Sequence, residues 1–469
     1  MTIRSLREKF LEGTYTPLHA YADARAVIDT RDGDIHAFLH VYDDAREAAV
    51  LATKRYKEEG EKTPLLLGMP IAVKNNILIK GKPATAGSKI LENYIAPYDA
   101  TVISRLRAQD PVIMGDTNLD EFAMGSSTEN SAFGVTKNPL DLTRVPGGSS
   151  GGSGAAVTMG ASVVALGTDT GGSVRLPASF CGIVGYKPTY GAISRSGLIA
   201  MGSSLDQAGI FAHTVDDAEI VFNAVSGKDP LDATTIGPNT YAPVLLKEKY
   251  RIGVPRDFLR TGMDADVLAV FEATIQELLK AGHDVVDVSL PLMERGLAAY
   301  YIVMPAEVSS NLARYDGVRF GLKVQGDNLL EDYRKTRAAG FGAEVKRRII
   351  LGTYVLSAGY YDAFYGKAED ARRMMRDELG EVFKTVDLIM TPTAPTPAYK
   401  IGEKADPLSM YLGDIFTVPV NLTGVPAISI PMGTVERDHI QLPVGVQYIA
   451  PHAGDTRLFD FGKKVFDTK

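Results

Sequence analysis

The segment from Arg144 to Gly191 reads RVPGGSSGGSGAAVTMGASVVALGTDTGGSVRLPASFCGIVGYKPTYG, and it contains two loops rich in glycine and serine. The first loop covers residues 147–152 and the second covers residues 171–173, with an apolar segment between them. Each loop leads into a stretch that can be helical. Loops of this composition present backbone N–H groups and serine hydroxyls to a common point, so this segment is the first candidate for a functional centre.

Outward from this segment, helical and extended patterns alternate along the chain. Helices are predicted over residues 101–108, 153–159, 214–225, 265–280 and 456–465, and strands over residues 65–73, 112–114, 162–166, 252–254, 285–288, 387–390, 427–430 and 444–449. Alternation of this kind predicts an α/β fold built on one extended sheet.

The N-terminal segment and the connecting segments predict the domain organisation. The first 62 residues predict helices that pack outside the main sheet, one of them capped by Thr16 before Pro17. Residues 226–249 are rich in Pro, Asp and Thr and predict a surface loop. Because the sequence has no repeat and no long linker, we predict one domain over residues 1–469, with its α/β core in residues 63–469.

The bulk composition excludes several classes of protein. The chain has 469 residues and a net charge of −7, so a large basic face for nucleic acid is not expected. A single cysteine, Cys181, excludes a disulfide framework and a cysteine-based metal site within the chain. No apolar run is long enough to span a bilayer, and the first residues do not resemble a signal peptide, so we predict a cytoplasmic protein without a bound metal.

Short motifs in the first loop are ambiguous. Residues 147–151 match the pattern G-x-S-x-G, which in α/β-hydrolases carries a nucleophilic serine, here Ser149. The preceding segment ends in Pro146 and is not a buried strand, so the match is weak and a flexible loop is the alternative. No Walker A or G-x-G-x-x-G motif supports nucleotide binding, and no histidine spacing supports metal hydrolysis.

The longer pattern resembles the amidase signature family. The resemblance rests on three blocks of the sequence, at residues 147–152, 167–175 and 181–189. It implies a large mixed central β-sheet covered by helices on both faces. It also implies a catalytic triad of Lys74, Ser149 and Ser173, in which Ser149 has an unusual cis peptide bond and Ser173 is the nucleophile.

The residue chemistry is consistent with these implied roles. A serine hydroxyl needs a base, and Lys74 can act as that base through Ser149 only if its amine is neutral. Burial lowers the pKa of a lysine, and a shift from about 10.4 to about 7 corresponds to roughly 4 to 5 kcal/mol. The family commonly has an acidic residue after the lysine, whereas this chain has Asn75. Neighbouring strand residues point to opposite faces, so Asn75 is expected not to touch the Lys74 ammonium.

The second loop is predicted to stabilise the reaction intermediate. Thr170, Gly171, Gly172 and Ser173 would supply backbone N–H donors to an oxyanion, and the two glycines would let the backbone approach the substrate closely. Ser173 would begin a helix, whose N-terminus is positive.

Further motifs resemble, within this family, the A subunits of tRNA-dependent amidotransferases. These motifs lie at residues 120–129, 204–207, 344–349 and 357–363. The resemblance implies a glutaminase in which Tyr300, Arg348 and Asp414 hold free glutamine. A free amino acid carries a carboxylate and an ammonium, so its pocket requires a forked cation and an opposing anion. On the sequence alone, Tyr301 and Arg347 are neighbouring alternatives.

The same resemblance implies partners. A B subunit would bind tRNA, ATP and magnesium and use the ammonia to amidate Glu-tRNA(Gln) or Asp-tRNA(Asn), and a small C subunit would complete a heterotrimer. No cofactor is expected on this chain. Two alternatives remain. A stand-alone amidase would act on small amides and would not need Arg348 and Asp414, whereas the intact set of Lys74, Ser149 and Ser173 argues against a non-catalytic scaffold.

Overall fold

One mixed sheet of eleven strands forms the centre of the molecule. The computed structural model describes residues 1–240, 246–260, 262–404 and 406–468. The strands are β1 (Phe38–Val41), β2 (Pro70–Lys74), β3 (Val112–Thr117), β4 (Val164–Asp169), β5 (Val184–Lys187), β6 (Gln207–Ala212), β7 (Arg251–Val254), β8 (Asp284–Asp287), β9 (Leu388–Pro392), β10 (Ala427–Arg437) and β11 (Ile440–Ile449). Their order is β1-β3-β2-β4-β6-β5-β10-β11-β9-β7-β8. The strand β2 runs parallel to β3 and β4, and β7 runs parallel to β8 and β9, whereas the other neighbours are antiparallel.

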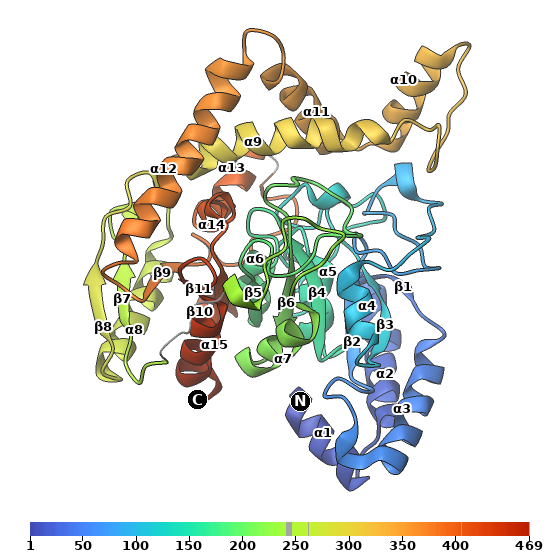
Figure 1. The fold of residues 1–469 in the computed structure, drawn as a ribbon, viewed down its shortest axis with the longest axis vertical. Helices are drawn as coiled ribbons and strands as arrows, with labels where there is room; N and C mark the ends of the chain where they lie inside the picture. Colours follow the sequence, from blue (N-terminus) through green and yellow to red (C-terminus); the bar gives the residue numbers. More distant parts are fainter. Residues whose placement is uncertain (241–245, 261, 405, 469) are drawn as a thin grey trace.

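Helices cover both faces of this sheet, so the predicted α/β fold with a large mixed sheet is confirmed (Figure 1). The helices are α1 (Ile3–Glu12), α2 (Pro17–Ile35), α3 (Ala45–Glu59), α4 (Thr101–Arg107), α5 (Gly151–Thr158), α6 (Arg175–Cys181), α7 (Val215–Val225), α8 (Ala265–Lys280), α9 (Gly296–Asn311), α10 (Leu329–Gly340), α11 (Ala343–Val355), α12 (Lys367–Val382), α13 (Pro407–Tyr411), α14 (Val418–Thr423) and α15 (Asp455–Gly462). One core cluster joins the sheet to α2, α5 and α6, and another joins it to α4, α7 and α15.

The side chains of β2 alternate between these two clusters. Ile71 and Val73 belong to the cluster that contains α4 and α7, whereas Ala72 belongs to the cluster that contains α5 and α6. Because strand side chains alternate with a period of two, Lys74 lies on the same face as Ala72, toward α5 and α6. The pleat therefore directs Lys74 toward the first glycine- and serine-rich loop, which precedes α5.

A separate helical layer lies above one end of the sheet. Helices α9, α11 and α12 run across the top of the molecule in Figure 1, and α10 extends from this layer at the upper right. The layer has its own core cluster, which includes Tyr300 and Met304 of α9, Val345 of α11 and Met375 of α12. Since the same cluster also contains Phe122 and Leu205 from loops of the sheet body, the layer is packed directly onto that body.

The N-terminal segment differs from the prediction. The helices α1, α2 and α3 lie outside the sheet, and Thr16 caps α2 by accepting a hydrogen bond from the His19 N–H. However, β1 lies between α2 and α3 and pairs with β3 in antiparallel orientation. The N-terminal segment is therefore not purely helical as predicted, because Phe38–Val41 form the edge strand of the sheet.

Several other elements were not anticipated. The strands β5 and β6 are fully buried, and their sequences VGYK and QAGIFA lack a clear alternation of apolar and polar residues. The predicted surface loop at residues 226–249 contains one short helical turn, Pro238–Thr240, and its residues 241–245 lie outside the described part of the chain. The division between an N-terminal segment and a core at residue 62 stays a prediction.

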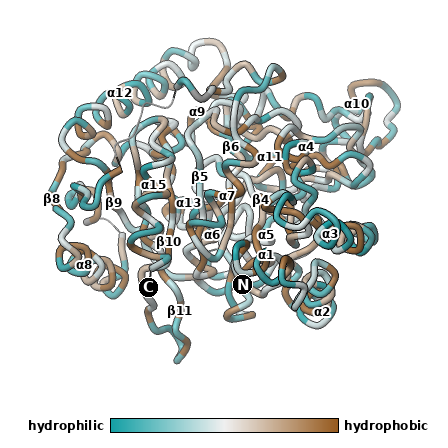
Figure 2. The backbone as a smooth tube through the Cα atoms, turned by 60° about the horizontal axis from the view of Figure 1, so that its bottom comes forward, coloured by the Kyte–Doolittle hydropathy of each residue, from teal (hydrophilic) through white to brown (hydrophobic). Residues whose placement is uncertain are grey.

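The helices combine polar and apolar faces. In Figure 2, hydrophilic and hydrophobic stretches alternate along α3, α8 and α12, as expected for helices with one buried face. Across the described ranges, none of the helices is both long enough and apolar enough to cross a membrane.

Candidate active site

Lys74 is the buried centre of a cluster of hydroxyl groups. It ends β2 and its side chain is completely inaccessible to solvent. Its Nζ atom lies 2.8 Å from Ser149 Oγ, 2.8 Å from Ser150 Oγ and 2.9 Å from Thr168 Oγ1. These three neighbours are neutral hydroxyl groups. Within the described residues, no carboxylate forms a hydrogen bond with the Lys74 amine. The structure therefore brings Lys74 and Ser149 together as the sequence predicted.

Burial determines the protonation of this amine. It lowers the pKa of Lys74 to about 7, against the opposing effect of the carboxylates of Asp120, Asp169 and Asp206. A lysine with this pKa is partly neutral near pH 7 and can accept a proton. Asn75 does not alter this balance directly, because its side chain donates to the Pro83 carbonyl at 3.1 Å and accepts from Thr85.

The backbone around Ser149 is held by the loop that contains Asp120. The peptide bond between Gly148 and Ser149 is cis. The Ser149 carbonyl accepts a hydrogen bond from the Asp120 N–H at 3.3 Å, and the Asp120 carboxylate accepts from the backbone of Thr128 and Asn130. A Cβ atom at Gly148 would lie 2.2 Å from Asp120 Oδ2, so only glycine fits there. Asp120 is a positioning residue; it begins the motif at residues 120–129, but the sequence assigned it no role.

Ser173 lies between the end of β4 and the start of α6. It is 8% exposed, and its carbonyl accepts a hydrogen bond from the Ser150 N–H at 3.2 Å. The two glycine- and serine-rich loops are therefore joined through their backbones. The helix α6 begins at Arg175, two residues after Ser173, rather than at Ser173 itself.

An ion pair inside the second loop sets the shape of its backbone. Asp169 accepts hydrogen bonds from the Gly172 and Val174 N–H groups and from Nε and Nη2 of Arg175. Arg175 is fully buried, and its remaining N–H groups donate to the Thr417 carbonyl and to the side chains of Gln447 and Asn421. Although burial raises the pKa of Asp169, Arg175 outweighs it and holds this pKa at about 2.

The ion pair also narrows the predicted oxyanion hole. Because the Gly172 N–H is already donated to Asp169 at 2.8 Å, the donors left for an oxyanion are the N–H groups of Thr170, Gly171 and Ser173. Both glycines are required by close contacts. A Cβ atom would lie 2.9 Å from Tyr300 Oη at Gly171 and 2.2 Å from Thr417 Oγ1 at Gly172, where φ is +134°.

Removing the charge of Asp169 should destabilise the protein strongly. We expect Asp169→Asn to lower the free energy of unfolding by about 3 to 5 kcal/mol, because it leaves Arg175 as an unpaired charge in the interior. The measurement is urea denaturation. The control is Asp370→Asn, which breaks an exposed pair with Arg373 and should cost less than about 1 kcal/mol. A loss at Asp169 no larger than that of the control would contradict this account.

The three residues predicted to bind glutamine come from three separate elements. Tyr300 is on α9, Arg348 is on α11, and Asp414 ends the short turn Leu412–Asp414. Tyr300 and Arg348 are 4% and 3% exposed, whereas the side chain of Arg347 is 49% exposed. Tyr300 is the tyrosine in contact with Gly171 of the second loop. The geometry thus favours Arg348 over Arg347 and Tyr300 over Tyr301.

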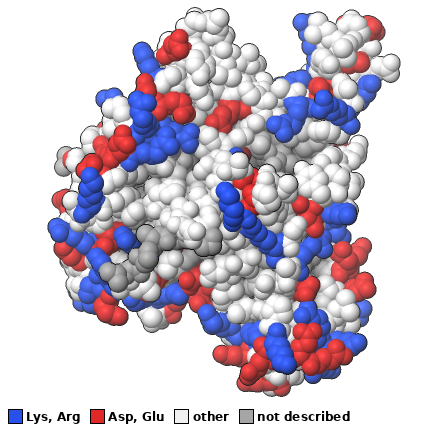
Figure 3. All heavy atoms as spheres, viewed as in Figure 1, with Lys and Arg blue, Asp and Glu red and all other residues white. Residues whose placement is uncertain are grey.

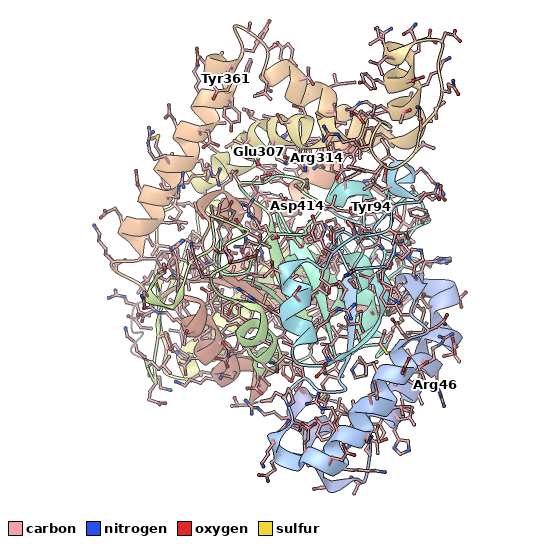
Figure 4. The ribbon with its side chains drawn as sticks, turned by 45° about the vertical axis from the view of Figure 1, so that its right-hand side comes forward. Arg46, Tyr94, Glu307, Arg314, Tyr361 and Asp414 are labelled. Carbon is pink, nitrogen blue, oxygen red and sulfur yellow. The ribbon has the colours of Figure 1, made fainter. Side chains whose placement is uncertain are left out.

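Asp414 lies beneath α9, where the upper helical layer meets the sheet body (Figure 4). Its Oδ2 atom accepts a hydrogen bond from Ser126 Oγ at 2.6 Å. Burial raises the pKa of Asp414 to about 7, and Ser126 and Arg348 only partly oppose this effect. A cation that enters beside Asp414 would therefore restore its negative charge.

Several buried residues that hold the site were not predicted from the sequence. The side chains of four of them bond to one of the two loops or to Lys74: Ser150, Thr168, Asp169 and Thr417. Arg175 acts through its ion pair with Asp169, and Asp120 acts through its backbone N–H, which donates to the Ser149 carbonyl. Ser150, Thr168, Asp169 and Arg175 lie inside the segment from Arg144 to Gly191, so their position was a signal. Thr417 is far away in sequence and gave none. Within the described residues, no group of three or more His, Cys, Asp or Glu side chains could hold a metal ion.

The base available to these serines is a lysine. A buried lysine of lowered pKa beside two serine-bearing loops is the arrangement of the lysine-dependent serine amidases, and the fold and the site together define this class of protein.

Comparison with known proteins agrees with this class. The family model described as Amidase matches residues 24–459. The chain is 52% identical over 431 residues to the A subunit of glutamyl-tRNA(Gln) amidotransferase from Koribacter versatilis, covering 91% of this chain and 89% of the relative. The crystal structure of the corresponding protein of the same name from Thermotoga maritima superposes with a TM-score of 0.78 at 42% identity, covering 98% of this chain and 93% of that one. A 6-aminohexanoate cyclic dimer hydrolase superposes with a TM-score of 0.84 at 25% identity, covering 100% of this chain and 96% of the hydrolase.

The chain therefore belongs to the amidase signature family and, within it, to the group of glutamyl-tRNA(Gln) amidotransferase A subunits.

Proposed function

We propose that this chain is the glutamine-hydrolysing subunit of a tRNA-dependent amidotransferase. The observation that carries the proposal is the placement of Arg348 and Asp414 beside Tyr300, which itself contacts Gly171 of the loop that bears Ser173. A cation and an acid in one site match the carboxylate and ammonium of a free amino acid. The side-chain amide of that amino acid would react at Ser173, which ends the loop that Tyr300 contacts.

The chemistry proceeds through an acyl-enzyme in this proposal. Ser173 Oγ attacks the side-chain carbonyl carbon of glutamine while its proton passes through Ser149 to the neutral Lys74. The N–H groups of Thr170, Gly171 and Ser173 stabilise the negative oxygen of the tetrahedral intermediate. The proton returns to the nitrogen as the C–N bond breaks, and ammonia leaves. Water then attacks the ester while Lys74 again accepts a proton through Ser149. The ester C–O bond breaks, the proton returns to Ser173 Oγ, and glutamate is released.

The names of the relatives, which call each protein a subunit, support an assembly of several chains. We infer a B subunit that binds tRNA, ATP and magnesium and consumes the ammonia on Glu-tRNA(Gln), with Asp-tRNA(Asn) as a further acceptor, and a C subunit that completes a cytoplasmic heterotrimer. The distribution of charge supports leaving tRNA to the partner. Over the face in Figure 3, basic side chains are interspersed with acidic ones rather than gathered into one field, and the net charge is −7.

The decisive experiment measures glutamate release by the purified chain, alone and after assembly with candidate B and C subunits and tRNA. We expect release from glutamine in the assembly, coupled to amidation of the aminoacyl-tRNA. Hydrolysis of small aliphatic amides with no activity on glutamine under any of these conditions would instead establish the stand-alone amidase.

Replacing Arg348 should mainly impair the capture of glutamine. We expect Arg348→Ala to raise KM for glutamine by roughly 10- to 100-fold, because it removes a charge-assisted contact worth about 1.5 to 3 kcal/mol, while kcat changes less. Steady-state kinetics of the assembled enzyme provide the measurement. Arg347→Ala is the matched control, and its KM should stay within about threefold of the unmodified enzyme because that side chain is half-exposed. The reverse order of effects would assign the carboxylate to Arg347.

A further inference from the structure

Glu344 is a buried carboxylate without a role in the chemistry described so far. It lies in the first turn of α11, it is 7% exposed, and both of its oxygens are bonded. Its Oε1 atom accepts from Arg348 Nε at 2.7 Å and from the Tyr411 hydroxyl at 2.8 Å, and its Oε2 atom accepts from Arg347. A carboxylate is costly to bury, so these contacts are what keep it in place.

Two tyrosine rings complete the surroundings of Arg348. The rings of Tyr301 and Tyr411 are stacked, with centroids 3.9 Å apart and planes at 25°. Arg348 Cζ lies 5.5 Å from the centroid of each ring, within the range of a cation–π contact. Tyr411 thus contacts Arg348 with its ring and Glu344 with its hydroxyl. The Arg348 guanidinium is therefore held by its ion pair with Glu344 and by its contacts with the two tyrosine rings.

These contacts leave one end of the Arg348 fork for a ligand. Its Nε–H is taken by Glu344, and its Nη1 atom lies 3.6 Å from the sulfur of Met304, which is a weak acceptor. In the described part of the chain, no carboxylate other than Glu344 pairs with Arg348. The remaining Nη–H groups can therefore donate two parallel hydrogen bonds to a ligand carboxylate.

The charges in this cluster also favour an anionic ligand. Glu344 is shared between Arg347 and Arg348, so the three side chains together carry one surplus positive charge. Arg347 is half-exposed, so solvent screens its charge, and the attraction for a ligand carboxylate comes mainly from the buried Arg348.

We propose that Glu344 and Tyr411 are positioning residues that hold Arg348 by its Nε side, so that the pocket selects amides that carry a carboxylate over amides that lack one. This inference rests on the proposed function, in which that carboxylate belongs to glutamine. It extends the proposal by naming the residues through which the chain distinguishes an amino acid from a simple amide.

The test compares two substrates in two variants of the assembled enzyme. Tyr411→Phe removes only the hydroxyl, and Glu344→Gln removes only the charge. For both variants we expect KM for glutamine to rise about tenfold, the size of one charge-assisted hydrogen bond, with kcat and the kcat/KM for butyramide within about twofold. Butyramide carries the reacting amide but no carboxylate. Equal losses on both substrates would mean that these residues only maintain the fold, and would overturn the proposal.

We call the contacts of Glu344 and Tyr411 with Arg348 the clamp. Matched controls separate the loss of the clamp from the effect of the same substitution elsewhere. Tyr354→Phe makes the same substitution on the exposed side of α11, and Glu381→Gln makes it at an exposed ion pair of α12. Both controls should leave the two substrates unaffected. A KM for glutamine that rises as much in the controls as at Tyr411 and Glu344 would also overturn the proposal.

A binding measurement distinguishes this inference from the proposed function. Calorimetry with glutamine is performed on the Ser173→Ala protein, with and without Tyr411→Phe. A tenfold weaker Kd with the second change supports the clamp, and an unchanged Kd overturns it while the proposed function stands. If the Ser173→Ala protein does not bind glutamine at all, both the proposed function and the clamp are overturned.

Discussion

Ser173→Ala is expected to abolish the hydrolysis of glutamine. The rate should fall by at least about 10⁴-fold, because the hydroxyl that forms the acyl bond is removed and only the donors of the second loop remain. Glutamine binding should persist, since Tyr300, Arg348 and Asp414 lie on other elements. The measurement is glutamate release over time, combined with mass spectrometry of enzyme quenched during turnover.

Two outcomes bear on this assignment. The unmodified enzyme should carry a glutamyl adduct on the peptide that contains Ser173, and the variant should carry none. Ser310→Ala, at an exposed position of α9, is the matched control and should retain full activity. An adduct on Ser149 or Ser150 would show that the nucleophile is in the first loop and would overturn the proposed roles of the three triad residues.

Substituting Lys74 should lower activity nearly as much as Ser173→Ala does. Comparing alanine with arginine at this position shows whether Lys74 acts as a base. We expect Lys74→Ala to lower kcat/KM by about 10²- to 10⁴-fold, the usual contribution of a general base. Lys74→Arg should be no better, because a guanidinium keeps its proton at any accessible pH. If Lys74 served only as a buried cation, the arginine would restore activity. Lys80→Ala, at an exposed position beyond β2, is the control.

The pH profile follows from the same amine. Burial lowers the pKa of Lys74 to about 7, and the base is active only when it is unprotonated. The kcat/KM of the unmodified enzyme should therefore be constant above this pH and fall about tenfold per pH unit below it. Asp414, whose pKa burial raises to about 7, would steepen the fall, since its carboxylate binds the ammonium of the ligand. A rate that rises with acidity would exclude neutral Lys74 as the base.

Much of the fold could be predicted because its signals are local. The helix α8 spans the residues predicted for it, and α7 begins one residue after the start of its predicted range, with Thr214 as its cap. The edge strand β1 was missed because four residues between two helices carry almost no periodic signal. The strands β5 and β6 were missed for a different reason: a fully buried strand is predicted from a continuous apolar run, and VGYK and QAGIFA are interrupted by glycine and polar residues.

The candidate site, like the fold, has parts that the sequence predicts and parts that it does not. Sequence patterns and family resemblance were sufficient to propose Lys74, Ser149 and Ser173, since the two loops and the strand before Lys74 are continuous motifs. They could not choose between Arg347 and Arg348. Adjacent residues of a helix share the same sequence neighbours and differ only in the direction in which their side chains point. The packing of α11 against α9 makes that choice, burying Arg348 and leaving Arg347 half-exposed.

The sequence by itself determined the class of chemistry, because the candidate base, relay serine and nucleophile each lie in a continuous motif that can be recognised before the fold is known. Only the tertiary structure decided how these groups are tuned. The pKa of Lys74 depends on complete burial among hydroxyl groups from β4 and the first loop, and the Gly172 N–H is removed from the oxyanion hole by Asp169. Both effects depend on distances between side chains and backbone groups, which the order of residues does not specify.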